Sequence, residues 1–265
     1  MKYLIIDGSN FIIYRYFAIK RWWSFANKDI PFDDLSELFK NKFIKLMITK
    51  IEELKKKFKI SSVNQIFFAK DCPRKQIWRN SIYDDYKKNR ENLDQNKNIP
   101  FYINLTYSEI LPSISLNNIL YHPRLEGDDC IAITCKKLSN DENNEILIIS
   151  GDTDLLQLSQ KNINLFSPNL KNLKESKNYK KFGDLNLLMK IICGDKSDNI
   201  PPVFQKYSEK KIFEFLQDKN KINELLNESN MQEKYSLNEE LIDFNKIPSP
   251  LIIEFYSLNS FFNYI

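Results

Sequence analysis

Nine acidic residues stand in short motifs whose composition and spacing suit the binding of metal ions. They are Asp7, Asp71, Glu126, Asp128, Asp129, Asp152, Asp154, Asp195 and Asp198. Four of the chain's five glycines lie directly beside one of these acids. Where glycine is this scarce, each glycine marks a backbone position at which a side chain would clash or a positive φ is needed. We therefore expect the acidic motifs to come together in one site.

Carboxylates gathered in one place raise one another's pKa values and oppose folding unless cations neutralise them. Oxygen-only ligation favours Mg²⁺ or Mn²⁺ over zinc. Two such ions roughly 3.5–4 Å apart can stabilise both the attacking and the leaving oxygen of a phosphodiester. We expect two Mg²⁺ ions, for which Mn²⁺ can substitute, and phosphodiester hydrolysis as the reaction. Helix capping is the alternative for the motif Glu126–Asp129, and a surface charge cluster is the alternative for any single motif.

A basic segment rich in aromatic residues follows Asp71 within twenty positions. Its cations are Arg74, Lys75, Arg79, Lys87, Lys88 and Arg90, and its aromatic residues are Trp78, Tyr83 and Tyr86. Cations can hold phosphates while aromatic rings stack on bases, so the segment favours a nucleic-acid substrate. A solvated basic helix is the alternative. The chain's 39 basic residues exceed by 13 the 26 acidic residues outside the proposed site, which is the charge balance of a phosphate binder.

The composition excludes several other classes of protein. The chain is 42% hydrophobic and 28% charged, which fits a globular protein of one or two domains and not a disordered one. Its apolar stretches are far shorter than the roughly 18 residues of a membrane span, and no signal-peptide core follows Met1, so we expect a soluble cytoplasmic protein. The four cysteines form no CxxC pair, and we expect reduced thiols. The single histidine, His122, makes Ser-His-Asp and Cys-His catalysis unlikely candidates and is expected to be structural.

Short apolar runs that end just before the acids predict the strands that position them. These runs cover residues 3–6, 65–69, 145–149 and, more weakly, 163–166. Helical periodicity lies between them, most clearly over residues 35–58 and 130–138. This alternation predicts an α/β domain over residues 1–183, with a mostly parallel central sheet flanked by helices and with functional groups at the carboxyl ends of the strands. From about 184 to 265 the strand signals disappear, and a smaller helical domain is expected.

Together these motifs resemble the flap endonuclease and 5'-3' exonuclease family, and within it most closely the ribonucleases H of T-even bacteriophages. The matching segments are Ile-Ile-Asp7-Gly-Ser-Asn, Asp71, Trp78-Arg79, Tyr86-Lys-Lys-Asn-Arg90, Glu126-Gly-Asp-Asp129, Ser150-Gly-Asp-Thr-Asp154 and Gly194-Asp-Lys-Ser-Asp-Asn-Ile-Pro201. They follow the family's order. The resemblance implies a PIN/FEN-like nuclease core, an arch region near residues 79–122 that admits the single-stranded 5' end, and a DNA-binding role for the helical domain.

The resemblance also implies roles for individual residues. Asp7, Asp71, Glu126, Asp128 and Asp129 would help to hold a first metal ion, and Asp152, Asp154, Asp195 and Asp198 a second, with Asp129 and Asp152 as candidate bridges. Lys87 and Arg90 would contact the scissile phosphate and act in catalysis. DNA-binding roles fall to Arg79, Tyr86 and Lys88. Where many relatives have a Gly-rich hairpin, residues 201–208 contain no glycine, and Lys206, Lys210 and Lys211 are expected to bind duplex DNA, with a solvated face as the alternative.

The implied function is a metal-dependent, structure-specific nuclease that cuts DNA and RNA–DNA hybrids from 5' ends or at 5' flaps, with ribonuclease H activity and a role in primer removal during replication. It would act as a monomer, away from membranes, and a single-stranded-DNA-binding protein or a sliding clamp is a candidate partner. Two alternatives stay open. An aspartyl phosphatase would use Asp7 as nucleophile, although Ser9 stands where such sites carry a second Asp. A DNA-junction binding module with a decayed site is the other, although all nine acids are present. Residues 91–99 of the arch are expected to be mobile without DNA.

Overall fold

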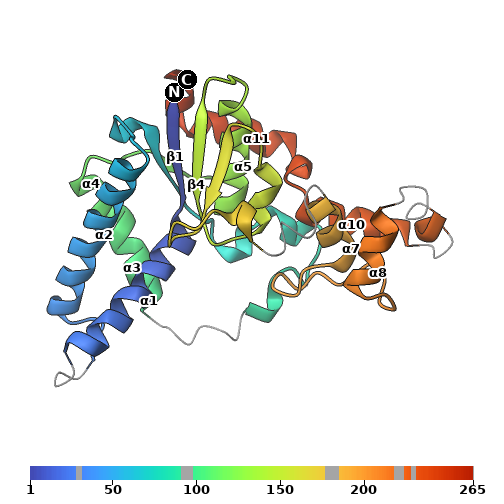
Figure 1. The fold of residues 1–265 in the computed structure, drawn as a ribbon, viewed down its shortest axis with the longest axis horizontal. Coiled ribbons are helices and arrows are strands. Elements are labelled where there is room, and N and C mark those ends of the chain that lie inside the picture. Colours follow the sequence, from blue (N-terminus) through green and yellow to red (C-terminus); the bar gives the residue numbers. More distant parts are fainter. Residues whose placement is uncertain (28–31, 91–97, 177–184, 218–223, 228–230, 265) are drawn as a thin grey trace.

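A five-stranded, all-parallel sheet forms the centre of the computed structural model, which describes residues 1–27, 32–90, 98–176, 185–217, 224–227 and 231–264. The strand order is β3-β2-β1-β4-β5 (Figure 1). The strands are β1 (Lys2–Asp7), β2 (Ile66–Ala69), β3 (Ile119–Leu120), β4 (Glu145–Ile149) and β5 (Ile163–Phe166). The predicted α/β class with a parallel sheet is confirmed. Sequence patterning missed β3, because it has only two residues and pairs only with the end of β2.

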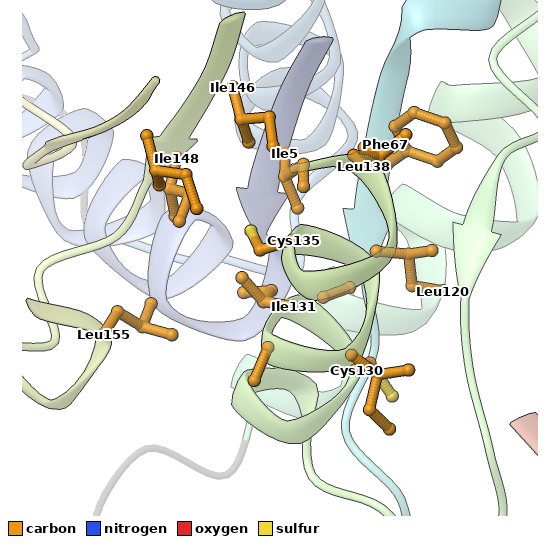
Figure 2. Close-up of a cluster of buried hydrophobic side chains, with 14 of the residues drawn as sticks. Ile5, Phe67, Leu120, Cys130, Ile131, Cys135, Leu138, Ile146, Ile148 and Leu155 are labelled. Atoms are coloured by element: carbon orange, nitrogen blue, oxygen red, sulfur yellow. The ribbon is translucent and has the colours of Figure 1, made fainter. Parts of the chain in front are cut away.

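Strand β1 lies in the middle of the sheet, and its side chains alternate between two hydrophobic cores. Leu4 and Ile6 face one core, which is built with the helices α1 (Gly8–Ala26), α2 (Glu37–Lys57) and α3 (Ile99–Leu105). Ile5 faces the other core, which is built with α5 (Gly127–Leu138) (Figure 2) and with α11 (Ser249–Leu258). All three side chains are fully buried. A strand covered by helices on both faces is apolar at successive positions, which explains the continuous run in the sequence.

The two longest described helices begin at capping side chains. Asp7 ends β1 and caps α1 (Gly8–Ala26), since its carboxylate accepts a hydrogen bond from the backbone of Asn10. Ser36 caps α2 (Glu37–Lys57) in the same way. The other helices of the sheet domain are α3 (Ile99–Leu105), α4 (Leu111–Ser113) and α5 (Gly127–Leu138), with a π-helix at Thr106–Ile110. Short 3₁₀ helices cover Val63–Gln65, Arg74–Gln76, Trp78–Ser81, Lys88–Arg90, Asp154–Leu158 and Leu173–Glu175.

The second half of the chain contributes helices to two places. The helices α7 (Asn186–Cys193), α8 (Glu209–Leu216) and α10 (Gln232–Ile242) lie together at one side of the sheet domain (Figure 1). By contrast, α11 (Ser249–Leu258), which we expected in the same helical domain, returns to the sheet, where Leu251 and Phe255 join the core of Ile5. The 3₁₀ helices Phe244–Lys246 and Ser260–Tyr264 flank α11. This return brings the two ends of the chain side by side (Figure 1).

The single histidine fastens α11 to the sheet domain. His122 is fully buried, its Nδ1 accepts a hydrogen bond from the backbone N–H of Arg124, and its Nε2 lies 3.1 Å from Glu254 Oε2.

Across the described ranges, no helix is both long enough and apolar enough to cross a membrane.

Candidate active site

The acidic residues predicted at strand ends meet in one cleft at the carboxyl edge of the sheet. The cleft measures about 510 Å³. Its acidic lining comes from the end of β1, the loops after β2 and β4, and the start of α5, and consists of Asp7, Asp71, Glu126, Asp128 and Asp152. Parallel strands end at the same edge, which is why residues more than 140 positions apart share this cleft. Residues Ile99, Pro100 and Ile103 of α3 form an apolar wall.

One backbone N–H and one hydroxyl group fix the carboxylate of Asp7. Its Oδ1 accepts the backbone N–H of Asn10 at 3.1 Å, and its Oδ2 accepts the hydroxyl of Ser150 at 2.6 Å. Burial, and next the charge of Asp71, raise the pKa of Asp7 to about 7. The following Gly8 is sterically required, because a Cβ there would lie 2.4 Å from the backbone oxygen of Ala69 on β2. The raised pKa of Asp7 means that its ionised carboxylate lacks a compensating positive charge, which a bound cation would supply.

The loop after β2 is tied to the start of α5 at the same cleft. Asp71 Oδ1 accepts the backbone N–H of Gly127 at 2.6 Å. Glu126, Asp128 and Asp129 each offer an oxygen within 4.8 Å of the other two. Burial, followed by the charges of Glu126 and Asp129, raises the pKa of Asp128 well above its ordinary value. These acids therefore form a compact set of oxygen donors.

Asp129 differs from the other acids of the site because both of its oxygens are bound by the same arginine, Arg79. It is fully buried, and its carboxylate is held by two nitrogens of Arg79, by Trp78 Nε1 at 3.0 Å and by the backbone N–H of Glu126 at 3.1 Å. The last contact caps α5, so the capping alternative considered for this motif applies to Asp129. The structure thus gives Asp129 a set of partners different from those of a bridging metal ligand.

Arg79 and Tyr86, which we expected to contact DNA, are buried among the acids of the site. Arg79 is 2% exposed and Tyr86 is 6% exposed. The guanidinium of Arg79 binds Asp129 and lies 3.0 Å from Glu126, and the hydroxyl of Tyr86 donates to Glu126 at 2.9 Å. Both side chains pack inward because their polar ends meet buried carboxylates.

Lys87 and Arg90 line the cleft and are paired with acids from two different motifs. Lys87 Nζ lies 2.5 Å from Glu126 Oε1 and 3.4 Å from Asp198 Oδ2, and Arg90 also pairs with Asp198. No α-helix forms over residues 86–90, where only a short 3₁₀ helix covers Lys88–Arg90. Lys87 instead adopts a left-handed backbone with φ 55°, and its N–H donates to the backbone oxygen of Asp198 at 2.9 Å. The shared partner Asp198 brings the two cations together.

The second group of acids gathers at the end of α7. Asp195 and Asp198 lie in the turn after Gly194, whose φ is +70° and where a Cβ would lie 2.4 Å from the backbone oxygen of Ile200. Asp154, at the start of a 3₁₀ helix, and Asp195 both pair with Lys190 of α7. Burial raises the pKa of Asp152, although the charge of Lys190 acts in the opposite direction. The predicted second set is thus assembled, but a lysine lies within it.

The remaining predicted DNA-binding lysines are all exposed. Lys88 pairs with Asp85 at 2.9 Å beside the cleft. Lys206 lies in a turn before α8, and Lys210 and Lys211 lie on α8 itself, where Lys211 pairs with Glu214 at 3.1 Å. Residues 91–97, in the part of the arch that we expected to be mobile, lie outside the described residues.

Three residues of the site were missed in the sequence. Asn10 and Ser150 orient the first acids, since Ser150 Oγ also accepts the backbone N–H of Asp152 at 3.0 Å and Asn10 accepts that of Gly151 at 2.8 Å. Lys190 is the third. It is the one charged residue in the sequence Leu-Leu-Met-Lys-Ile-Ile, and a lone charge in so apolar a helix is the signal that could have found it.

The chain is similar in sequence to known 5'-3' exonucleases. Residues 2–183 match the family model described as 5'-3' exonuclease, N-terminal resolvase-like domain. A 5'-3' exonuclease of Mycoplasmopsis pulmonis (strain UAB CTIP) is 32% identical over 204 residues, which are 75% of this chain and 61% of that protein. A 5'-3' exonuclease of Buchnera aphidicola subsp. Baizongia pistaciae is 30% identical over 216 residues, or 77% of this chain and 62% of that protein. The chain thus spans about six tenths of the length of these relatives.

Solved structures share the fold over nearly the whole chain. The D15 protein of bacteriophage T5, crystallised with metal ions, matches with a TM-score of 0.72 and 17% identity, over 98% of both chains. A complex of the T5 D15 flap endonuclease with DNA and metal ions matches with a TM-score of 0.65 and 18% identity, again over 98% of both chains. These matches support the same sheet and the same helical region for this chain.

Proposed function

The chain belongs to the 5'-3' exonuclease family, and we propose that it is a metal-dependent nuclease that cuts DNA, and RNA in RNA–DNA hybrids, from 5' ends or at 5' flaps. The observation that carries this proposal is the cleft in which acids from four separate segments face Lys87 and Arg90. Such a cleft combines carboxylate ligands for metal ions with cationic side chains that can bind a phosphate. A role in primer removal during replication follows from such an activity.

The acids of the cleft fit divalent metal ions. Their donors are all oxygens, which suits Mg²⁺ or Mn²⁺. The pKa values of Asp7, Asp128 and Asp152 are all raised, so the ionised cluster is short of positive charge. Asp7, Asp71, Glu126 and Asp128 would hold one ion, and Asp152, Asp154, Asp195 and Asp198 the other. When bound, such ions supply Lewis acidity and a nucleophile at neutral pH.

The cations of the cleft would bind the phosphate that is cut. Lys87 and Arg90 share Asp198 as an ion-pair partner, and both line the cleft. An incoming phosphate can replace that carboxylate as their partner, which would place two positive charges on the group where negative charge develops. The buried Arg79, which holds Asp129 and Glu126, acts behind them as a positioning residue.

Cleavage of a 5'-labelled flap substrate with Mg²⁺, with and without a chelator, tests the proposal. We expect cleavage near the junction with Mg²⁺, none with the chelator, and recovery when Mg²⁺ is restored. A 3'-flap substrate of the same sequence serves as the control and should be cut far more slowly.

Other outcomes would identify the alternatives. An intact flap at high enzyme concentration, together with tight binding, would indicate a DNA-junction binding module. Release of phosphate from a small phosphomonoester through a trapped phospho-Asp7 would indicate an aspartyl phosphatase.

A further inference from the structure

Lys190 lies within the group of acids to which the proposed function assigns the second metal ion. Its Nζ is 2.7 Å from Asp195 Oδ2, and it also pairs with Asp154. The lysine side chain is 22% exposed, and those of Asp154 and Asp195 are 18% and 11% exposed. One ammonium group therefore joins two carboxylates that are largely shielded from water.

The helix α7 fixes Lys190 in this place. Its neighbours Met189, Ile191 and Ile192 are buried in the helical part of the protein, so the backbone that carries the lysine is held by packing on both sides. Asp195 follows directly after the end of this helix. The packing of α7 therefore holds Lys190 next to the two acids.

The two groups of acids differ in how the protein compensates their charge. Among the described acids assigned to the first ion, Asp7, Asp71 and Asp128 have no lysine or arginine within ion-pair distance, whereas Glu126 pairs with Lys87 and Arg79. Burial, and next the charge of Asp71, raise the pKa of Asp7 to about 7. In the other group, burial would raise the pKa of Asp195, but the hydrogen bond and charge of Lys190 lower it to about 2. The second group is therefore neutralised from within.

We propose that Lys190 is a built-in competitor for the second metal ion, whose ammonium group occupies Asp154 and Asp195 and must leave them when a divalent ion binds there. This role rests on the proposed function of the site. Because the ion and the ammonium compete for the same two carboxylates, the lysine lowers the ion's affinity, and removing the lysine must raise it. In the described part of the chain, no single ammonium group joins two of the acids assigned to the first ion, since Lys87 pairs with Glu126 alone among them, so removal of Lys190 should leave that site unchanged.

Titration of the metal-free protein with Mn²⁺, in which electron paramagnetic resonance counts the free ion, measures the number of bound ions and their dissociation constants. We expect a tighter and a weaker class of site. In Lys190→Met the weaker class should tighten by about tenfold or more, while the tighter class stays within about twofold. Lys50→Met is the matched control, because Lys50 also lies on a helix, pairs with Glu53 at 3.0 Å and has an 18% exposed side chain.

Thermal unfolding of the same variants separates competition from a structural role. Competition predicts that Mn²⁺ raises the Tm of Lys190→Met, and of a second variant Lys190→Gln, by more than it raises that of the wild type. A purely structural lysine would weaken both classes of Mn²⁺ site together and lower the Tm with and without the ion. Unchanged or weakened binding in the second class, in both variants, would overturn the proposal, as would failure of both to fold even with Mn²⁺.

Flap cleavage by the wild-type protein, measured on the same preparations, tests the proposed nuclease function separately from the role of Lys190. Cleavage by the wild type with no change of Mn²⁺ affinity in the variants would reject the role of Lys190 alone. Absence of both cleavage and Mn²⁺ binding in the wild type would reject the proposed function.

Discussion

The guanidinium of Arg79 donates hydrogen bonds to both carboxylate oxygens of Asp129 inside the protein, with Nη2 2.7 Å from Oδ1 and Nη1 2.8 Å from Oδ2. The arginine is 2% exposed and the aspartate is fully buried. A paired arrangement of this kind is directional and fixes both side chains. It anchors the basic segment after β2 to the first turn of α5, and so it sets where Glu126 and Asp128 stand.

Loss of Arg79 should be costly to stability. In Arg79→Met the carboxylate of Asp129 would be left buried without its partner, and we expect the free energy of unfolding to fall by about 3–5 kcal/mol. Urea unfolding measures this, with Lys50→Met as the control for a partly exposed pair, where the loss should be at most about 1 kcal/mol. If Asp129→Asn instead loses one bound Mn²⁺ and keeps full stability, Asp129 is a metal ligand after all.

Lys87 and Arg90 should affect the rate of cleavage more than the binding of DNA. Removing one cation that meets developing charge would raise the barrier by about 2–4 kcal/mol, so Lys87→Ala and Arg90→Ala should lower the single-turnover rate roughly 30-fold to 1000-fold. Lys88→Ala is the comparison, because Lys88 is exposed beside the same cleft. It should weaken affinity, reduce its salt dependence by about one charge and leave the saturated rate unchanged. Seeing only that pattern for Lys87 and Arg90 would assign them to DNA binding.

The metal-free protein should become less stable as the pH rises. Burial and Asp71 raise the pKa of Asp7 from 3.8 to about 7, so the folded state binds its proton more tightly than the unfolded state does. That contribution is complete below about pH 4 and is lost as the pH passes 7, and it amounts to at most about 4 kcal/mol. The raised pKa values of Asp128 and Asp152 act in the same direction.

Urea unfolding in chelator at pH 5 and at pH 8 checks this pH dependence. Asp7→Asn should flatten the profile, whereas Glu142→Gln, in an exposed loop at the opposite end of β4, should not. A wild-type profile that is flat, or that rises with pH, would show that Asp7 keeps an ordinary pKa.

Gly194 should tolerate no side chain. Its φ of +70° and the 2.4 Å approach of the backbone oxygen of Ile200 mean that Gly194→Ala must distort the turn that carries Asp195 and Asp198. We expect a loss of stability of about 1–3 kcal/mol and weaker Mn²⁺ binding to the second group. Gly151→Ala is the matched control, because a Cβ there meets only the side chain of Asn10, at 3.2 Å. Equal effects of the two substitutions would contradict this account.

Much of the sheet could be predicted from the sequence, because strands buried on both faces leave continuous apolar runs such as Ile146–Ile149. The same runs predicted that Asp7, Asp71 and Asp152 would share an edge. The two-residue strand β3 could not be predicted, since pairing with β2 and not its own pattern makes it a strand. The return of α11 to the sheet was missed for a similar reason. Its apolar face could pack either against the sheet or against the other C-terminal helices, and only the tertiary fold determines which.

The chemistry of single residues was harder to predict than their membership of the site. Arg79 and Tyr86 look like DNA-binding residues in a basic segment, but their partners Asp129 and Glu126 come from 40 to 50 positions away and draw them inside. Lys190 is another case, because its meeting with Asp154 depends on how α7 packs against the loop after β4. Side-chain pairing over such distances is set by the tertiary fold.

The most direct test of the central claim is the single-turnover rate of flap cleavage by Asp152→Asn at saturating Mg²⁺, measured beside its affinity for the same DNA with the metal removed. Asp152 lines the cleft between the two groups of acids, so its loss should impair both. We predict a rate at least about 1000-fold below that of the wild type, or ~4 kcal/mol in the barrier, with DNA affinity within about twofold. Cleavage by Asp152→Asn at the wild-type rate would contradict the assignment of this acidic cleft as the active site.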